Sequence, residues 1–113
     1  MDLTTLTEPG DGYVTVLVSG ELDLHTASTL RDAALAALRQ HGTCLRVDLE
    51  GVTFMDSTGI EVLLATRRRA ELEGGSLTLL SPTQAVWRVI EVTGLDKLFT
   101  IEPSSRPVPS DPT

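Results

Sequence analysis

Residues 54–60 read FMDSTGI. The segment follows a run of apolar residues, and after it apolar side chains recur at the spacing of one helix face as far as Ala70. It therefore predicts a junction at which a buried strand ends and a helix begins. Asp56, Ser57 and Thr58 place three consecutive oxygen-bearing side chains at this junction.

On both sides of this junction, sequence patterns typical of strands alternate with patterns typical of helices. Apolar runs, several rich in β-branched residues, predict strands at 3–8, 13–19, 45–49, 76–80 and 99–101, with a further apolar run at 52–55. Helical spacing predicts three helices, which end at Gly42, Gly74 and Gly94. This order predicts one α/β domain at 1–102, with a mostly parallel central sheet, an antiparallel edge strand and crossover helices. Residues 103–113 are rich in proline and serine and predict a disordered tail.

Local signals predict where individual elements begin and end. Gly20–Asp23 is expected to break the second strand. Ser81–Gln84 combines a capping serine, proline at the first helical position and glutamine three residues after the cap, which predicts the start of the third helix. Thr58 and Glu61 fit a capping box at the second helix. Cys44 is expected to be a small buried residue at the start of a strand.

The composition limits the classes of function. The chain has 113 residues, of which 16 are acidic and 9 basic, and its net charge of −7 disfavours nucleic acid as a partner. Cys44 is the single cysteine, and His25 and His41 have no partner at metal-ligand spacing, so we expect no disulfide, metal or other cofactor. Because no apolar stretch approaches the ~20 residues that cross a bilayer, we expect a cytoplasmic protein without a membrane partner.

The junction at Asp56–Thr58 allows two interpretations. Side chains of these types are ordinary N-caps before a helix, and capping alone accounts for them. A helix N-terminus also presents unpaired N–H groups and partial positive charge, which stabilise an anion. In the second interpretation, one of the hydroxyl groups accepts a phosphoryl group.

Several motifs together resemble one family of bacterial regulators. They are Gly20–Asp23 (GELD), His25–Ala27 (HTA), Phe54–Gly59 (FMDSTG), Ser81–Pro82 and Gly94–Leu95. In this order and at this spacing they resemble the anti-anti-sigma factors of the STAS domain family. The resemblance implies a STAS-like single domain that is not an enzyme. It implies binding of an anti-sigma factor, usually a serine kinase with a GHKL-type ATP site, so that a sigma factor is released.

The resemblance also implies roles for individual residues. In family members the anti-sigma factor phosphorylates the residue directly after the motif aspartate, here Ser57, and phosphorylation ends the binding. Asp56, Thr58 and Gly59 match the motif positions around this acceptor, and Asp23 matches a residue near the partner surface. A separate phosphatase is expected to remove the phosphate. We expect the chain to be a monomer or a weak dimer.

The sequence departs from the family pattern at Glu61. Many relatives carry a small residue, often glycine, at this position. A carboxylate one helical turn beyond Ser57 can pair with a basic residue of the partner, or it can repel the incoming phosphate. Glu61 is therefore included among the expected partner-binding residues.

Other functions are alternatives to a phosphorylation switch. Within the same fold, the chain could be a scaffold or subunit of a signalling assembly or of a lipid-transport complex. A phospho-aspartate receiver would use Asp48 and Asp56 near the end of a central strand, but it also needs an acidic pair and a phosphate-binding lysine, and Lys97 follows the third helix. A hydrolase would need a nucleophile elbow and an oxyanion site, which the spacing does not show.

Overall fold

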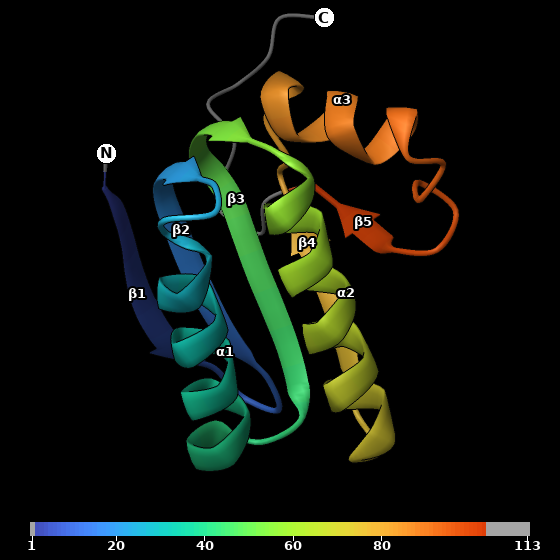
Figure 1. Ribbon diagram of the computed structural model, residues 1–113. Helices are drawn as coiled ribbons and strands as arrows, with labels where there is room; N and C mark the ends of the chain where they lie inside the picture. The colour runs from blue at the N-terminus through green and yellow to red at the C-terminus, as the bar shows by residue number, and fades with distance from the viewer. Residues whose placement is uncertain (1, 104–113) are drawn as a thin grey trace, which may run out of the picture.

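In a computed structural model, the described residues 2–103 form a five-stranded sheet and three helices (Figure 1). The tail predicted for 103–113 lies outside the described residues except for Pro103. This order of elements confirms the α/β class. Along the chain the elements are β1 (Leu3–Pro9), β2 (Val14–Leu22), α1 (Ala27–His41), β3 (Cys44–Met55), α2 (Ser57–Leu72), β4 (Ser76–Leu80), α3 (Gln84–Val92) and β5 (Thr100–Glu102).

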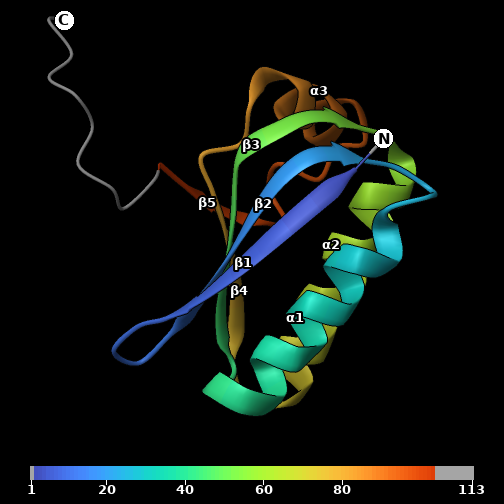
Figure 2. The same ribbon diagram turned by 90° about the vertical axis from the view of Figure 1, so that its left-hand side faces the viewer.

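The sheet is mixed, with its strands in sequence order from β1 to β5. β1 pairs antiparallel with β2, whereas the other neighbouring strands pair in parallel. Figure 2 shows α1 and α2 side by side on one face of the sheet, with α3 near one end of it. The mostly parallel sheet, the antiparallel edge strand and the crossover helices are therefore confirmed.

The hydrophobic core lies between the sheet and the two helices α1 and α2. Alternate residues of β2 and β3 point into it, because successive side chains of a strand face opposite sides of the sheet. Burial of each valine or leucine side chain contributes about 1.5–3 kcal/mol. Fully buried members include Val14, Val16, Val18, Leu45, Val47 and Leu49 from the strands and Leu30, Ala34 and Leu63 from the helices.

β2 is longer than the sequence suggests. It continues to Leu22, so the prediction that Gly20–Asp23 breaks this strand is wrong. Gly20 has a φ of +113°, and a Cβ atom there would lie 2.2 Å from the carbonyl oxygen of Asp2. The glycine thus permits an irregularity and the close approach of β1, and the strand continues past it.

β3 is one strand of 12 residues and not two short apolar runs. Its register against β2 shifts between the pairs Leu17–Asp48 and Ser19–Gly51. A Cβ atom on Gly51 would lie 2.3 Å from the Ser19 hydroxyl oxygen, so glycine fits this crowded position. Cys44, the first residue of the strand, is exposed, which corrects the expectation that it is buried.

The start of α3 also differs from the prediction. Its N-cap is Thr83, whose hydroxyl accepts a hydrogen bond from the Val86 N–H at 3.4 Å. Ser81, the predicted cap, lies before it with a φ of +48°. The Thr83 hydroxyl also donates to the Val52 carbonyl oxygen at 2.7 Å. This contact with β3 anchors the cap, and no local sequence pattern reveals it.

Candidate functional site

Two loops meet at the carboxyl end of the central strands. Leu22 and Met55, the last residues of the parallel strands β2 and β3, are paired. The Asp56 N–H donates a hydrogen bond to the Leu22 carbonyl oxygen at 3.3 Å. The loop before α1 and the junction before α2 therefore lie side by side. This arrangement brings Asp23 and Asp56, both predicted site residues, to the same end of the sheet.

Asp56 is the N-cap of α2. Its carboxylate accepts a hydrogen bond from the Thr58 N–H at 2.9 Å, and its carbonyl oxygen accepts one from the Gly59 N–H at 3.1 Å. The helix begins at Ser57, so the predicted capping box of Thr58 and Glu61 is wrong. Asp56 takes the capping role because its extended backbone, with φ −113° and ψ −171°, turns its carboxylate onto the first helical turn.

Ser57 is the first residue of α2, and its side chain is exposed. Its hydroxyl makes no hydrogen bond with any group of residues 2–103. The neighbouring N–H groups at the start of the helix carry partial positive charge, which stabilises an anion. Because Asp56 supplies the cap, the Ser57 hydroxyl is available to react or to contact another molecule.

Gly59 is buried beneath this surface. A Cβ atom there would lie 2.6 Å from the Met55 Cγ and 2.9 Å from the Leu22 Cγ. The missing side chain lets the first turn of α2 pack directly against the ends of β2 and β3. Gly59 therefore positions the helix start, and any effect on a partner would act through that position.

A groove of about 220 Å³ lies between α1 and the first turns of α2. Thr58 is half-buried and Glu61 is exposed, and both line this groove together with Arg31 of α1. The two predicted residues thus line one groove, and Thr58 directly follows Ser57 in α2. Arg31 was not predicted, because its place at the groove depends on how the two helices pack.

Asp23 organises the turn before α1. One of its carboxylate oxygens accepts hydrogen bonds from the N–H groups of His25 at 2.9 Å and Thr26 at 3.2 Å. The buried Thr26 hydroxyl donates to the Glu21 carbonyl oxygen at 2.7 Å and accepts from the Asp23 N–H at 3.0 Å. These bonds hold the loop in one conformation. The sequence analysis assigned no role to Thr26, whose function depends on this turn.

Thr26→Val is expected to destabilise the protein by about 1–3 kcal/mol, because it leaves the Glu21 carbonyl and the Asp23 N–H without their shared partner. Chemical denaturation measures this change in the free energy of unfolding. Thr29→Val, at an exposed position of α1, is the matched control and should change stability by less than about 0.5 kcal/mol. Equal losses in the two variants would contradict the anchoring role of Thr26.

Two large apolar side chains are exposed at this end of the sheet. Leu24 in the turn is 72% exposed, and Phe54 near the end of β3 is 46% exposed. Exposed apolar groups next to polar ones are typical of surfaces that bind other proteins. The sequence analysis gave neither residue a binding role. An apolar residue inside the polar turn DLHT, residues 23–26, was the available signal for Leu24.

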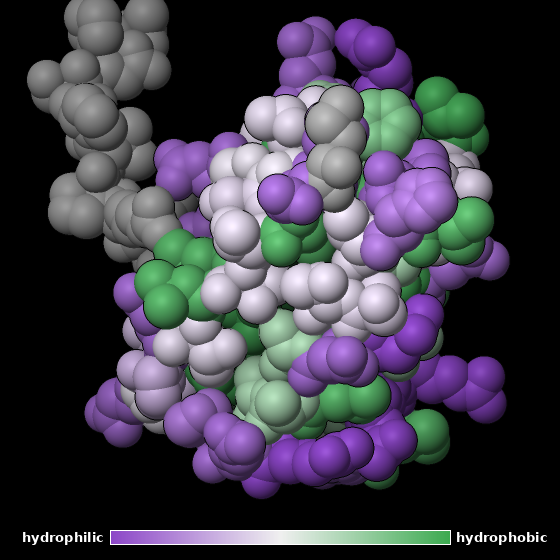
Figure 3. Space-filling view, turned by 60° about the vertical axis from the view of Figure 1, so that its left-hand side comes forward, coloured by the Kyte–Doolittle hydropathy of each residue, from purple (hydrophilic) through white to green (hydrophobic). Residues whose placement is uncertain are grey.

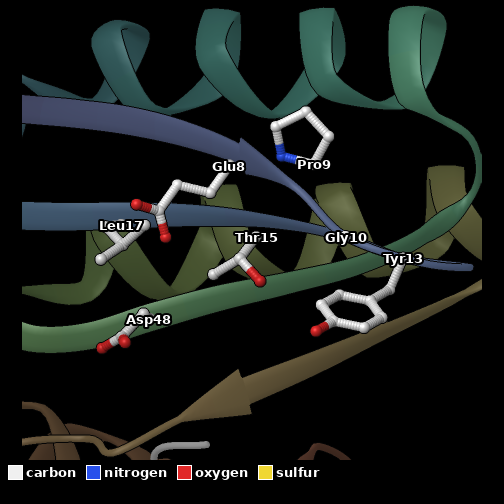
Figure 4. Close-up of a pocket in the computed structure, with 7 residues that line it drawn as sticks. All are labelled: Glu8, Pro9, Gly10, Tyr13, Thr15, Leu17 and Asp48. Carbon is white, nitrogen blue, oxygen red and sulfur yellow. The ribbon is translucent and has the colours of Figure 1, made fainter. Parts of the chain in front are cut away.

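A second hollow, of about 130 Å³, lies on the opposite face of the sheet (Figure 4). Figure 4 shows Glu8, Thr15 and Asp48 on this face, with α1 and α2 behind the sheet. Asp48 is buried in the middle of β3, where its carboxylate accepts a hydrogen bond from the Glu50 N–H at 3.0 Å. It does not lie with Asp56 at the end of the strand, so the receiver alternative is wrong.

Within residues 2–103, no three His, Cys, Asp or Glu side chains are grouped so that they could hold a metal ion. In the same part of the chain, no helix combines the length and apolar character needed to span a bilayer.

Comparison with known proteins identifies the family of this fold and site. The sequence model described as "Mlab, STAS domain" matches residues 7–101. The chain belongs to the STAS domain family. The match of this STAS domain runs from β1 to β5 and includes both loops of the candidate site.

Three relatives of this STAS domain bear related names. The anti-sigma-B factor antagonist of Bacillus subtilis strain 168 is 31% identical over 105 residues, which cover 93% of this chain and 95% of the relative. The structure of an anti-sigma factor antagonist from Mycobacterium paratuberculosis has a TM-score of 0.82 and 38% identity, covering 92% of this chain and 88% of the other.

The third relative is SpoIIAA, an anti-sigma factor antagonist and Bacillus cell fate determinant with a solved unphosphorylated and a solved phosphorylated form. Both forms are 26% identical to this STAS domain, with TM-scores of 0.76 and 0.70 respectively. The alignments cover 91% and 90% of this chain, and 90% and 93% of the SpoIIAA chains. These structures confirm the predicted STAS fold.

Proposed function

We propose that this STAS domain binds an anti-sigma factor so that a sigma factor is released, and that phosphorylation of Ser57 ends the binding. The observation that carries the proposal is the exposed Ser57 hydroxyl, which has no hydrogen-bond partner within residues 2–103 and stands at a helix start fixed by Asp56. Relatives of nearly the same length are named antagonists of anti-sigma factors. One of them, SpoIIAA, has a phosphorylated form.

The unmodified surface suits a partner with basic and apolar groups. Leu24 and Phe54 offer exposed apolar area, and the α1–α2 groove offers a concave contact at Thr58, the residue after Ser57. Asp23 and Asp56 contribute negative charge at the same end of the sheet, in a chain with a net charge of −7. Complementary basic residues on the anti-sigma factor would speed association and fix the orientation of the complex.

Phosphorylation would require only access to the Ser57 hydroxyl. The kinase transfers the γ-phosphoryl group of ATP to the Ser57 Oγ, a base of the kinase takes the hydroxyl proton, and ADP leaves. The catalytic groups and ATP therefore belong to the anti-sigma factor kinase. In the free STAS domain, the N–H groups and partial positive charge at the start of α2 accommodate the phosphate.

Phosphorylation would destabilise the complex with the anti-sigma factor and not the free STAS domain. The phosphate group carries a charge of about −1.5 to −2 and would be covered by the partner close to the carboxylates of Asp56 and Glu61. A buried charge without new cationic partners destabilises an interface strongly. A phosphatase that removes the group would restore binding, so the switch needs no refolding.

A reconstituted release experiment tests this function. The purified STAS domain is added to the cognate anti-sigma factor kinase bound to its sigma factor, and free sigma factor is measured with and without ATP. We expect release without ATP, and loss of release after incubation with ATP. Ser57→Ala should release sigma factor equally under both conditions. Failure of the unmodified chain to release sigma factor without ATP would contradict the proposal.

Proteins that co-purify with the tagged chain separate this function from its alternative. A GHKL-type kinase among them supports the anti-sigma factor antagonist. A transporter ATPase, or a very large assembly without a kinase, supports the subunit or scaffold function. In that case Ser57→Ala and Ser57→Asp should retain the same partners.

A further inference from the structure

β1 leaves a long edge of the sheet uncovered. Figure 2 looks onto this edge, with β1 in front of the sheet and α1 to one side. β1 has seven residues, LTTLTEP, and Glu8 is its one charged side chain. Natural edge strands are commonly protected by lysine, by bulges or by proline within the strand. β1 pairs with β2 without a shift of register, and Pro9 comes only at its end.

The backbone hydrogen bonds show which groups of β1 point outward. The Gly10 N–H donates to the Tyr13 carbonyl oxygen at 2.8 Å, and the Glu21 N–H donates to the Asp2 carbonyl oxygen at 3.3 Å. In an antiparallel pair such bonds involve every second residue, so even-numbered residues of β1 bond to β2. Leu3, Thr5 and Thr7 therefore direct their N–H and carbonyl groups outward, and Pro9, which has no N–H, directs only its carbonyl outward.

An apolar side chain is also exposed on this edge. Leu6 is 58% exposed and is paired directly with Leu17 of β2 on the sheet face opposite α1 and α2. Figure 3 shows this side of the molecule, where white and green residues fill the middle and purple residues lie mainly at the margins. An outward row of backbone groups beside an exposed leucine is suited to pairing with another strand.

We propose that β1 pairs antiparallel with β1 of a second copy of this chain, with Leu6 opposite Leu6 of the second copy on a two-fold axis. Thr5 and Thr7 then face each other across the axis and exchange backbone hydrogen bonds, because both point their N–H and carbonyl groups outward. The Leu3 N–H donates to the carbonyl oxygen of Pro9 in the second copy, and this outer pair has only that one bond because Pro9 has no N–H to return it. Each Leu6 is also paired with Leu17 of its own copy. The two Leu6 and the two Leu17 side chains therefore form one apolar row across the joined sheet.

The charged side chains favour this register of the β1–β1 pair over the registers centred on Thr5 or Thr7. Pairing about Leu6 places Glu8 opposite Thr4, so no two carboxylates face each other. A shift that pairs Thr5 with Thr5 would place Glu8 directly opposite Asp2, which is unfavourable on one face of a sheet. A shift the other way, which pairs Thr7 with Thr7, would place Glu8 opposite Leu6. The self-complementary sequence around Leu6 therefore fits a second copy of the chain.

The two-fold axis also leaves the candidate site open in both copies. β3 runs antiparallel to β1, and the axis reverses the strand direction of the second copy. The two Ser57 residues thus lie at opposite ends of the joined sheet. Because one strand pair makes a small interface, the dimer is expected to be weak and to form with rising concentration.

Sedimentation equilibrium over about a hundredfold range of concentration tests the interface. We expect the average mass to rise from one chain toward two, and Leu6→Lys to remain monomeric because it places two ammonium groups opposite each other. Leu72→Lys, which replaces an exposed leucine at the end of α2, should dimerise as the unmodified chain does. A single-chain mass at all concentrations would overturn the proposal. So would a dimer that Leu6→Lys does not weaken.

A disulfide tests the register separately. In a Cys44→Ser background, Leu6→Cys should form a covalent dimer under mild oxidation, because directly opposed residues on neighbouring strands lie within disulfide reach. Leu72→Cys in the same background is the control, since Leu72 is 74% exposed against 58% for Leu6. We expect Leu6→Cys to cross-link at least about tenfold faster. Equal rates would overturn the Leu6–Leu6 pairing.

Discussion

Ser57→Asp is expected to weaken binding of the anti-sigma factor about a hundredfold, which corresponds to about 2.7 kcal/mol. The added carboxylate would lie beside Asp56 and one helical turn from Glu61, and the partner would cover it without a new cation. The free STAS domain should keep its stability, because a negative charge at a helix N-terminus is favourable. Calorimetric titration measures the affinity, and thermal unfolding measures the stability.

Ser57→Asn is the matched control for this variant. Asparagine has nearly the size and shape of aspartate and no charge, so it should bind much more tightly than Ser57→Asp. Equal losses of affinity in the two variants would show that side-chain size, and not charge, controls the contact. That result would contradict the electrostatic switch.

Gly59→Val is expected to lower the free energy of unfolding by about 3 kcal/mol, at the upper end of the usual range for overpacking. The Cβ position is 2.6 Å from the Met55 Cγ, and the two added methyl groups would increase the overlap. The first turn of α2 must then move away from β2 and β3, or the core must shift. Chemical denaturation of the purified variant measures the loss.

Ala65→Val controls for the effect of a β-branched residue in α2. Ala65 is exposed on the same helix, so this change should cost only about 0.5–0.7 kcal/mol of helix propensity. If Gly59→Val is no less stable than Ala65→Val, the helix start tolerates a side chain at position 59. Gly59 would then not be the residue that sets the position of Ser57.

Local patterns predicted the elements whose boundaries depend on local chemistry. α1 and α2 follow apolar stripes and glycine stops, and β4 matches its apolar run at 76–80. The errors fall where a residue acts through a distant contact. Gly20 and Gly51 look like strand ends, but Gly20 makes room for Asp2, the residue before β1, and Gly51 makes room for Ser19 of β2.

The candidate site also combines features that the local sequence predicts with features that depend on tertiary contacts. Asp56 and Ser57 stand at a strand–helix junction that the sequence shows directly, although the cap is Asp56 and not Thr58. The contact between the two loops follows from the parallel pairing of β2 with β3. The burial of Thr26 depends on tertiary structure, so no pattern in the sequence assigned its role, whereas the exposed Leu24 had a signal in its place within a polar turn.

The most direct measurement determines, in one sample, which residue is phosphorylated and how tightly the chain binds the anti-sigma factor. The STAS domain is incubated with its anti-sigma factor kinase and ATP, the modified residue is identified by mass spectrometry, and the purified product is titrated with the anti-sigma factor. We predict one phosphate, on Ser57, and an affinity at least about a hundredfold below that of the unmodified chain. Phosphate on another residue such as Thr58, or undiminished binding by the Ser57-phosphorylated chain, would contradict the switch.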